Sequence, residues 1–246
     1  MRDDLRINGY AVVDGIVDET DLDVMRACVA RLEDMAGRRR SSGDGFVLEA
    51  PDVGGWVAWQ QGLPPASGVL RSVDGAHRHC PELTGIAETV AKTHIVPATG
   101  TDVDVVNTFL WAKPAKVGSE KPWHQDMAFA PDGFHDRYAN VVTAWIAVDP
   151  ATTENGCLQF VPGSHRLGVL PHVGDPERAD GDPPRERAVE PHVEPATVAT
   201  LGTPVHAPLD PGAGAVFDGL MVHRSAPNTS AAPRRALSFV FALHRR

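Results

Sequence analysis

Hydrophobic and polar positions follow two different periods along the chain. Residues 9–14 form a short apolar run that begins at a glycine and closes on Asp-Gly, which predicts a strand. Residues 18–37 carry apolar side chains every three or four positions, with acidic residues in the first turn and a glycine at the expected C-cap, so a helix is predicted. A second helix is predicted over residues 81–92, which begin with a proline. Residues 41–79 show no clear period and are expected to be irregular with short strands.

From about residue 102 the pattern changes to β-rich runs separated by turns that contain Pro, Gly, Asp and Asn. These runs are residues 103–112, 123–129, 141–148, 157–161, 203–207, 215–222 and 236–243. No helical period lies between them, which favours an antiparallel sandwich or barrel over a parallel βαβ sheet. Residues 174–195, dense in proline and mixed charge, are expected to form an exposed loop.

We therefore expect a single, mainly β domain over residues 1–246. Residues 1–100 are expected to supply a strand, helices and pocket-wall segments, and residues 101–246 the core. A content of 42% hydrophobic residues is enough for one substantial core. The three cysteines, Cys28, Cys80 and Cys157, form no Cys-x-x-Cys motif and are expected to be reduced and mostly buried.

The charge of the chain excludes some classes of partner. The formal net charge is −9, which argues against a general electrostatic grip on nucleic acid or on an anionic membrane surface. No apolar run approaches the roughly 18 residues of a membrane-spanning helix, and the N-terminus lacks the pattern of a signal peptide. We expect a cytoplasmic protein whose partner is a small molecule.

Candidate metal ligands occur in two separate apolar runs. His124 and Asp126 lie two positions apart in a strand-like run, and alternation along a strand would place both side chains on one face. His223 stands at the end of a later run. Two imidazoles and one carboxylate form the facial triad typical of non-haem Fe(II), which leaves coordination positions for a co-substrate and dioxygen. Arg234 precedes the last apolar run, and its planar guanidinium is suited to bind a carboxylate of that co-substrate.

Several motifs, in this order, resemble the phytanoyl-CoA dioxygenase family of Fe(II)/2-oxoglutarate-dependent oxygenases. They are Lys121-Pro-Trp-His124-Gln-Asp126, Val142-Thr-Ala-Trp145, Glu154-Asn-Gly-Cys-Leu158, Val161-Pro-Gly-Ser-His165, His223-Arg-Ser-Ala-Pro-Asn228 and Arg234-Arg235-Ala-Leu. The similarity extends from about residue 100 to the end, with a looser similarity in the front half. It implies a double-stranded β-helix, or jelly-roll, core with flanking α-helices.

The resemblance also implies roles for particular residues. Iron would be held by His124, Asp126 and His223. Arg234 would bind the distal carboxylate of 2-oxoglutarate, Ser225 would support that anion, and Trp145 would pack beside it. Asn107 stands where relatives commonly have a Gln that contacts the co-substrate. Arg235 is the competing anchor, but strand alternation should turn only one of the two arginines inward, and the spacing of the family favours Arg234.

The resemblance implies an enzyme that uses Fe(II), dioxygen and 2-oxoglutarate to oxidise a small molecule. The family includes halogenases that lack the metal carboxylate, and Asp126 fills that position here. Hydroxylation, or another two-electron oxidation such as desaturation, epimerisation or ring closure, is therefore expected, with conversion of 2-oxoglutarate to succinate and CO2. The substrate and the oligomeric state, monomer or homodimer, stay open. Two alternatives are a non-catalytic jelly-roll ligand-binding protein and a non-oxidative cupin-type metalloenzyme with Zn(II) or Mn(II).

Other chemically notable residues favour structural interpretations. The His77-Arg-His79-Cys80 motif lacks partners at zinc-finger spacing. His135 and Arg137 are expected in a solvated loop. The alternative is that they border the substrate entrance, where Arg137 would recognise an anionic group. Lys113 is expected to be exposed, as most lysines are.

Overall fold

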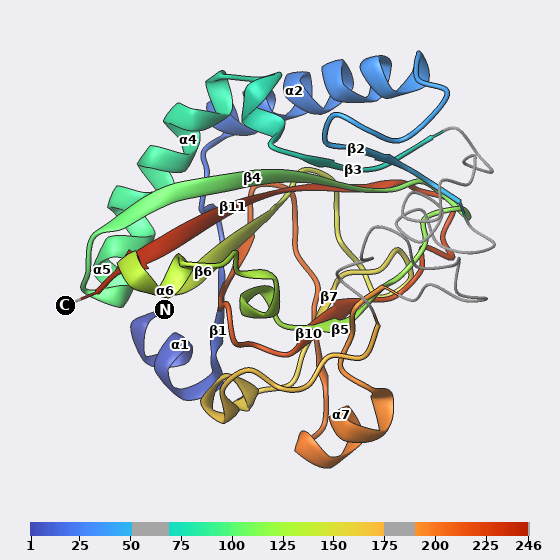
Figure 1. Ribbon diagram of the computed structural model, residues 1–246. Coiled ribbons are helices and arrows are strands. Elements are labelled where there is room, and N and C mark those ends of the chain that lie inside the picture. Colours follow the sequence, from blue (N-terminus) through green and yellow to red (C-terminus); the bar gives the residue numbers. More distant parts are fainter. Residues whose placement is uncertain (51–68, 175–189, 246) are drawn as a thin grey trace.

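The strands form two antiparallel sheets, and helices α2 and α4 lie over the outer face of the larger one (Figure 1). The computed structural model describes residues 1–50, 69–174 and 190–245, so the predicted loop lies largely outside the described residues. Within these described residues, the larger sheet has seven strands in the order β1-β9-β6-β11-β4-β3-β2, and the smaller has four in the order β5-β10-β7-β8. Every pairing between the described strands is antiparallel, so the chain forms the predicted jelly-roll core with flanking helices.

The strands of the larger sheet are β1 (Tyr10–Val13), β2 (Phe46–Leu48), β3 (Leu70–Asp74), β4 (Val103–Lys113), β6 (Tyr138–Ala147), β9 (Gly214–Asp218) and β11 (Arg234–His244). Those of the smaller sheet are β5 (Lys121–His124), β7 (Leu158–Phe160), β8 (Val205–Ala207) and β10 (His223–Ser225). The α-helices are α1 (Arg2–Asn8), α2 (Glu19–Gly37), α4 (Glu82–Val90), α5 (Val96–Thr99), α6 (Phe134–Arg137) and α7 (Pro195–Leu201). Short 3-10 turns are η1 (Ala76–Arg78), η3 (Asp126–Phe129) and η4 (Ser164–Leu167), and η2 (Ala91–Ile95) is a π-helical turn.

The two predicted helices are present, and the second is longer than expected. The side chain of Asp18 caps α2 by accepting a hydrogen bond from the Asp21 backbone N–H. Helix α4 continues through η2 into α5, because Ala91, Ile95 and Ala98 extend its buried apolar face beyond residue 92. The sequence pattern missed α1, α6 and α7, whose lengths of four to seven residues are too short for a clear helical period. No described helix is long and apolar enough to cross a membrane.

Alternation along β11 separates the main core from the cavity. Leu237, Phe239 and Phe241 pack with α2 and α4 in the largest apolar cluster. Arg234, Ser238 and Val240 line the cavity on the opposite face of the sheet. Side chains of the neighbouring strands β4 and β6 alternate between the two faces in the same register as those of β11. One face of the sheet therefore packs in the core, and the other lines the cavity. The cavity-lining residues on this face of the sheet are called the pocket floor below. They are Asn107, Phe109, Trp111, Lys113, Thr143, Trp145, Arg234, Ser238 and Val240.

Two of the predicted strands stop several residues early, and both lead into the site. The run 123–129 stops being a strand after His124, because residues 126–129 form η3. The run 215–222 leaves the larger sheet at Asp218, whose carboxylate accepts a hydrogen bond from the Leu220 backbone N–H and so forms a tight turn. This turn carries the chain to the smaller sheet, where β10 begins at His223.

The predicted exposed loop over residues 174–195 is wrong at its C-terminal end. Glu190 and Val193 are buried, and the Val193 backbone N–H donates to the carbonyl of Trp123. Residues 175–189 lie outside the described part of the chain. The polar composition of the segment gave no signal of this contact, because burial of Glu190 depends on partners far away in the sequence.

The expected state of the cysteines is borne out by their burial as free thiols. Burial raises the pKa of the Cys28 thiol from 9.0 to about 12 and raises those of Cys80 and Cys157. The thiolate is the reactive form, so the raised pKa makes the Cys28 thiol slow to react at pH 8. Ellman's reagent is therefore expected to titrate less than one thiol in the native protein at pH 8 and three after denaturation. Rapid reaction of native protein would contradict the burial described here.

Candidate active site

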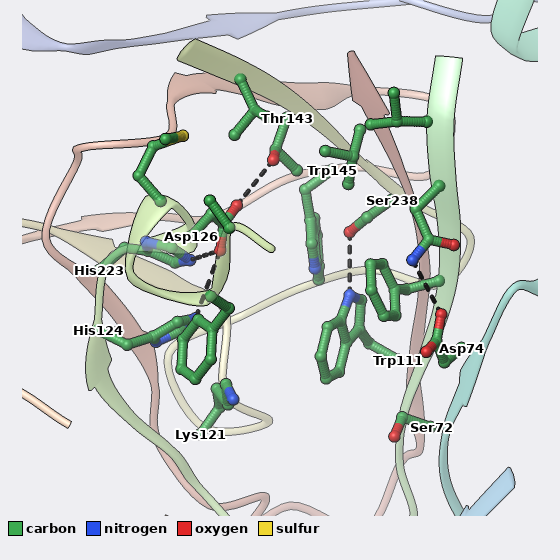
Figure 2. Close-up of a pocket in the computed structure, with 18 of the residues that line it drawn as sticks. Ser72, Asp74, Trp111, Lys121, His124, Asp126, Thr143, Trp145, His223 and Ser238 are labelled. Carbon is green, nitrogen blue, oxygen red and sulfur yellow. Dashed lines mark hydrogen bonds and ion pairs between the residues drawn. The ribbon is translucent and has the colours of Figure 1, made fainter. Parts of the chain in front are cut away.

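His124, Asp126 and His223 converge at one end of the cavity, although two of them lie almost 100 residues apart in the sequence (Figure 2). His124 ends β5 and His223 begins β10, and the two are direct cross-strand partners with ring centroids 4.1 Å apart. Asp126 lies in η3, and its Oδ1 atom is 3.6 Å from Nε2 of each histidine. The three ligand atoms lie within 4.8 Å of one another. The pairing was predicted on strand alternation, but Asp126 reaches the site from a 3-10 turn.

Both imidazoles present Nε2 to the centre of this group. His124 Nδ1 lies 2.8 Å from the carbonyl of Pro122, and His223 Nδ1 lies 2.9 Å from that of Met221. A proton on each Nδ1 satisfies these carbonyls and leaves the Nε2 lone pairs free. Burial lowers the pKa of both histidines, so the neutral form that binds a metal is favoured.

Asp126 is held by a neighbour on the pocket floor. The Thr143 hydroxyl donates to Asp126 Oδ2 at 2.7 Å, which leaves Oδ1 directed at the two histidines. This hydrogen bond fixes the carboxylate in the orientation that a metal ion requires.

Removing the Thr143 hydroxyl is expected to weaken metal binding without unfolding the site. In Thr143→Val the shape of the side chain is kept, but Asp126 loses its hydrogen-bond donor. Because such supporting contacts typically contribute 10- to 100-fold, the dissociation constant for Fe(II) should rise about tenfold. Anaerobic metal titration checks this, with the exposed Thr200→Val of α7 as the control. Equal Fe(II) affinities of the two variants would show that Thr143 does not support Asp126.

Gln125, between two of the ligands, ties three segments together. Its side chain is fully buried, and its amide nitrogen donates to the carbonyls of Gly168 and Leu220 at 2.9 and 2.6 Å. Its amide oxygen accepts from the Leu170 backbone N–H at 2.7 Å. The amide thus joins the His124–Asp126 segment to the turn that precedes His223.

Arg234 is buried at the closed end of the pocket floor, where it pairs across the strands with Lys113. Its Nε and Nη1 atoms have no hydrogen-bond partner among the described residues, and its guanidinium lies 5.1 Å from the ring centroid of Trp145. Burial lowers the pKa of Arg234 to about 10, so the group is still charged at neutral pH. An unpaired buried guanidinium is costly, which makes this position suited to an incoming carboxylate.

Arg235 points the opposite way, as alternation predicts. It donates to Asp149 through Nε and Nη2 at 2.6 and 2.8 Å, and its Nη1 lies 3.1 Å from Glu33. Hydrogen bonding to Asp149 raises the pKa of Arg235. Because its guanidinium pairs with Asp149 and Glu33, Arg235 does not line the cavity.

The remaining predicted site residues lie at different distances from Arg234. Trp145 contacts it directly, and Ser225 is a buried cavity-lining residue of β10. Asn107 also lines the cavity, but six residues of extended strand, about 20 Å, separate it from Lys113 beside Arg234. A carboxylate anchored on Arg234 is therefore out of reach of Asn107. Contacts of Ser225 and Asn107 with the co-substrate stay predictions.

Lys113 was expected to be exposed, and this prediction is wrong. Only 4% of the residue is exposed, and its Nζ donates to the carbonyls of Ser119 and Ser225. Burial and the neighbouring Arg234 hold the pKa of Lys113 well below its usual range. The strand β4 turns this lysine inward because it follows Trp111 on the same face.

Sequence reasoning also missed a buried ion-pair group beside the metal ligands. Glu190 accepts from Arg71 Nη2 at 3.1 Å and also pairs with Lys121. Arg71 donates in addition to the hydroxyl of Ser119 and the carbonyl of Glu120. These groups come from three distant segments, so no local motif could have revealed them.

Glu190 is expected to stabilise the fold in a pH-dependent way. Burial alone would raise the pKa of Glu190, but Lys121 and Arg71 outweigh it and lower the pKa below 4.5. A lowered pKa in the folded state gives stability that is present above pH 4.5 and is lost as the pH falls through the folded-state pKa. Glu190→Gln should therefore lower the free energy of unfolding at pH 7 by about 3 kcal/mol, a difference that narrows at acidic pH. Denaturant unfolding at pH 7 and pH 4 checks this, and a constant difference would contradict it.

The cavity that joins these groups has a volume of about 850 Å³. Phe129 and Met127, from η3, line it together with the pocket floor, and Val47 contributes from β2. Much of its surface is aromatic or aliphatic, with Phe129 43% exposed. The cavity is therefore large enough for a co-substrate and a second small molecule.

The structural interpretation of the His77-Arg-His79-Cys80 motif agrees with the contacts of its residues. His77 hydrogen-bonds to Thr108 and contacts none of the metal-ligand candidates. Cys28, Cys80 and Glu82 also lie close together, but Glu82 pairs with Arg31 and burial keeps both thiols protonated. Such protonated thiols are poor metal ligands.

The comparisons with known proteins agree on one family. The sequence profile of the phytanoyl-CoA dioxygenase (PhyH) family matches residues 5–236. The Rattus norvegicus phytanoyl-CoA dioxygenase domain-containing protein 1 is 30% identical over 179 residues, which are 72% of this chain and 58% of the relative. The peroxisomal phytanoyl-CoA dioxygenase of the same organism is 26% identical over 235 residues, or 94% of this chain and 64% of the relative. The chain thus spans less than two thirds of the length of these relatives.

Solved structures share the fold over almost the whole chain. EvdO2 from Micromonospora carbonacea var. aurantiaca has a TM-score of 0.66 and 25% identity, covering 99% of this chain and 89% of EvdO2. EctD from S. alaskensis with bound Fe has a TM-score of 0.70 and 20% identity, covering 98% of this chain and 75% of EctD. EvdO2 has also been solved with 2-oxoglutarate, and that structure is 24% identical with a TM-score of 0.65, covering 98% of this chain and 89% of that one.

Proposed function

The chain belongs to the phytanoyl-CoA dioxygenase family, and from this premise we propose that it is an Fe(II)- and 2-oxoglutarate-dependent oxygenase acting on a small molecule. The observation that carries the proposal is the presence, in one cavity, of the His124-Asp126-His223 group and of Arg234, whose Nε and Nη1 atoms have no hydrogen-bond partner among the described residues. Three ligands with a separate carboxylate anchor are the donor set that this chemistry needs.

The donor set fits Fe(II) better than a structural metal. Two neutral imidazoles and one carboxylate approach from one side, and the part of the chain that the structure describes adds no fourth His, Cys, Asp or Glu to the group. A structural zinc site would require a closed tetrahedron of four protein ligands. The open side faces the cavity, where a co-substrate can enter.

The closed end of the cavity fits a dicarboxylate co-substrate. Arg234 would hold the distal carboxylate through the two nitrogens that lack partners, with Trp145 packed beside it. The Lys113 amine lies on the neighbouring strand directly opposite Arg234, and it donates a hydrogen bond to the carbonyl of Ser225. Solved relatives with bound Fe and with bound 2-oxoglutarate support this assignment by analogy.

Bound Fe(II) and 2-oxoglutarate would supply dioxygen activation, with conversion of 2-oxoglutarate to succinate and CO2. The chain's own residues hold the reactants: Thr143 and Gln125 orient the ligands, and the buried side chain of Met127 contributes an apolar wall beside them. Because Asp126 occupies the position that halogenases leave free, hydroxylation or another two-electron oxidation of a C–H bond is the proposed reaction.

Succinate formation tests the proposal. Protein loaded with Fe(II) and 2-oxoglutarate should release succinate on admission of oxygen, slowly without substrate and faster with a substrate found by screening. Asp126→Ala, treated in the same way, should release none above background. Turnover of a substrate with Zn(II) or Mn(II) in the absence of oxygen would instead support a non-oxidative metalloenzyme, and ligand binding without any turnover would support a binding protein.

A further inference from the structure

A carboxylate is fixed at the far side of the cavity from the metal ligands (Figure 2). Asp74, the last residue of β3, accepts a hydrogen bond at Oδ1 from the Asn107 side-chain amide at 2.9 Å. The amide oxygen of Asn107 accepts in turn from the Thr108 backbone N–H at 2.8 Å. The following turn is attached to the same strand, because the His77 backbone N–H donates to the Thr108 hydroxyl at 2.9 Å. The orientation of the Asp74 carboxylate is therefore set by β4.

The other oxygen of this carboxylate is available to a ligand. Within the described residues the Asp74 side chain hydrogen-bonds only to Asn107, and it forms no ion pair. Asp74 lines the cavity and is exposed, although it is attached to the rigid larger sheet. A carboxylate that has a fixed orientation and no ion-pair partner is suited to bind a cationic hydrogen-bond donor.

Aromatic rings lie directly beside Asp74. Its cross-strand partner is Phe109, whose ring stacks on Trp111 with centroids 5.4 Å apart and an angle of 23° between the planes. Both rings line the cavity and are only half-buried. A carboxylate next to exposed aromatic rings is the combination that recognises an organic ammonium group, through an ion pair and cation–π contact.

Most other charged groups in the cavity are already engaged. Glu190 is paired with Arg71 and Lys121, and Arg137 is paired with Asp104. Arg78 has no ion-pair partner among the described residues, but it is exposed and no hydrogen bond orients its guanidinium, which folds over Gly75. Arg224 also lines the cavity, but its guanidinium is held by Gln159 and lies over Trp123. Among the described cavity-lining residues, Asp74 is thus an acid that is oriented without an ion pair, and an anion on Arg78 is the alternative that an experiment must separate from it.

We propose that Asp74, positioned by Asn107, binds a protonated amine on the substrate, whose apolar body lies along Phe109 and Trp111. The inference rests on the proposed function, because it places the substrate carbon that is oxidised at the end of the cavity where the metal ligands lie. Asp74, Phe109, Ser238 and Trp145 form one row across the sheet. Three strand spacings, about 14 Å, separate the ends of this row, so the space between Asp74 and Trp145 can hold an amine with a body of naphthalene size. Asn107 then acts on the substrate side and not on the co-substrate.

Three probes that share one ring system test the assignment: 2-naphthylmethylamine, 2-naphthylmethanol and 2-naphthoate. Each is titrated anaerobically by calorimetry into full-length protein saturated with Fe(II) and 2-oxoglutarate, so that Arg234 is occupied and does not bind the naphthoate. The amine should bind at least about tenfold more tightly than the alcohol, as expected for a charge-assisted hydrogen bond. In Asp74→Asn this ratio should fall to near one while the affinity for the alcohol stays within twofold, which shows that the ring site is intact.

Asp132→Asn is the matched control, because Asp132 also lines the cavity but has no partner on the pocket floor. Its amine-to-alcohol ratio should equal that of the unmodified protein. An amine that binds no more tightly than the alcohol, or an unchanged ratio in Asp74→Asn, overturns the proposal, and tightest binding of the naphthoate assigns recognition to Arg78 instead. The titrations measure binding and not turnover. If the protein prefers the amine but does not turn over 2-oxoglutarate, the proposed function is refuted and the amine site is not.

Discussion

Replacing Arg234 by methionine is expected to raise the dissociation constant for 2-oxoglutarate by at least about 100-fold, because removal of one partner from a buried charge pair is strongly unfavourable. Fe(II) affinity should change little, since Arg234 contacts none of the three metal-ligand candidates. Anaerobic calorimetry of the Fe(II)-loaded protein with 2-oxoglutarate measures the effect. In steady-state assays the same change should appear chiefly as a higher KM for 2-oxoglutarate.

The stability of the Arg234→Met variant separates lost binding from misfolding. Without a bound carboxylate, two nitrogens of the buried guanidinium have no partner in the part of the chain that the structure describes. Its replacement by an apolar side chain of similar length should therefore not lower the melting temperature. Arg235→Ala is the matched control: it removes the pairs with Asp149 and Glu33 and should lower stability, but it should leave 2-oxoglutarate affinity unchanged. Loss of 2-oxoglutarate binding in Arg235→Ala alone would show that the wrong arginine is assigned.

Replacing Asp126 or His223 by alanine is expected to abolish substrate-dependent turnover of 2-oxoglutarate. Each substitution removes one of three ligands, so Fe(II) affinity should fall by more than the 10- to 100-fold that supporting residues contribute. Succinate release at saturating Fe(II) measures the effect, with background as the expected value. His206→Gln, an exposed histidine on β8 of the same sheet as His223, is the control and should retain full activity. Unchanged turnover in both ligand variants would refute the metal assignment.

Much of the fold was predictable from sequence because its determinants are local. The stripe of apolar residues in α2 and the runs between turns gave the helix and the antiparallel strands, and alternation on β11 gave opposite directions for Arg234 and Arg235. The proximity of His124 and His223 was inferred from the ligand types that a facial triad needs and from the family resemblance, since nothing local to either residue encodes it. It is produced by the turn at Asp218, which transfers the chain between sheets.

What sequence could not supply depends on long-range burial. Lys113 and Glu190 belong to residue types that are mostly exposed, and only their partners from other segments explain their burial. Asp126 was expected on a strand, yet the chain bends into η3 immediately after Gln125, whose amide is held by two other segments. Asp74 gave no signal at all, because its relation to Asn107 and Phe109 exists only through the pairing of β3 with β4.

The most direct test of the central claim is anaerobic titration of metal-free protein with Fe(II) and 2-oxoglutarate, followed by visible absorption. A 2-oxo acid that chelates ferrous iron gives a weak charge-transfer band, which should appear with equimolar Fe(II) and should be absent in His223→Ala. Absence of the band in protein that has bound Fe(II) would contradict the account and favour the binding-protein or non-oxidative alternatives.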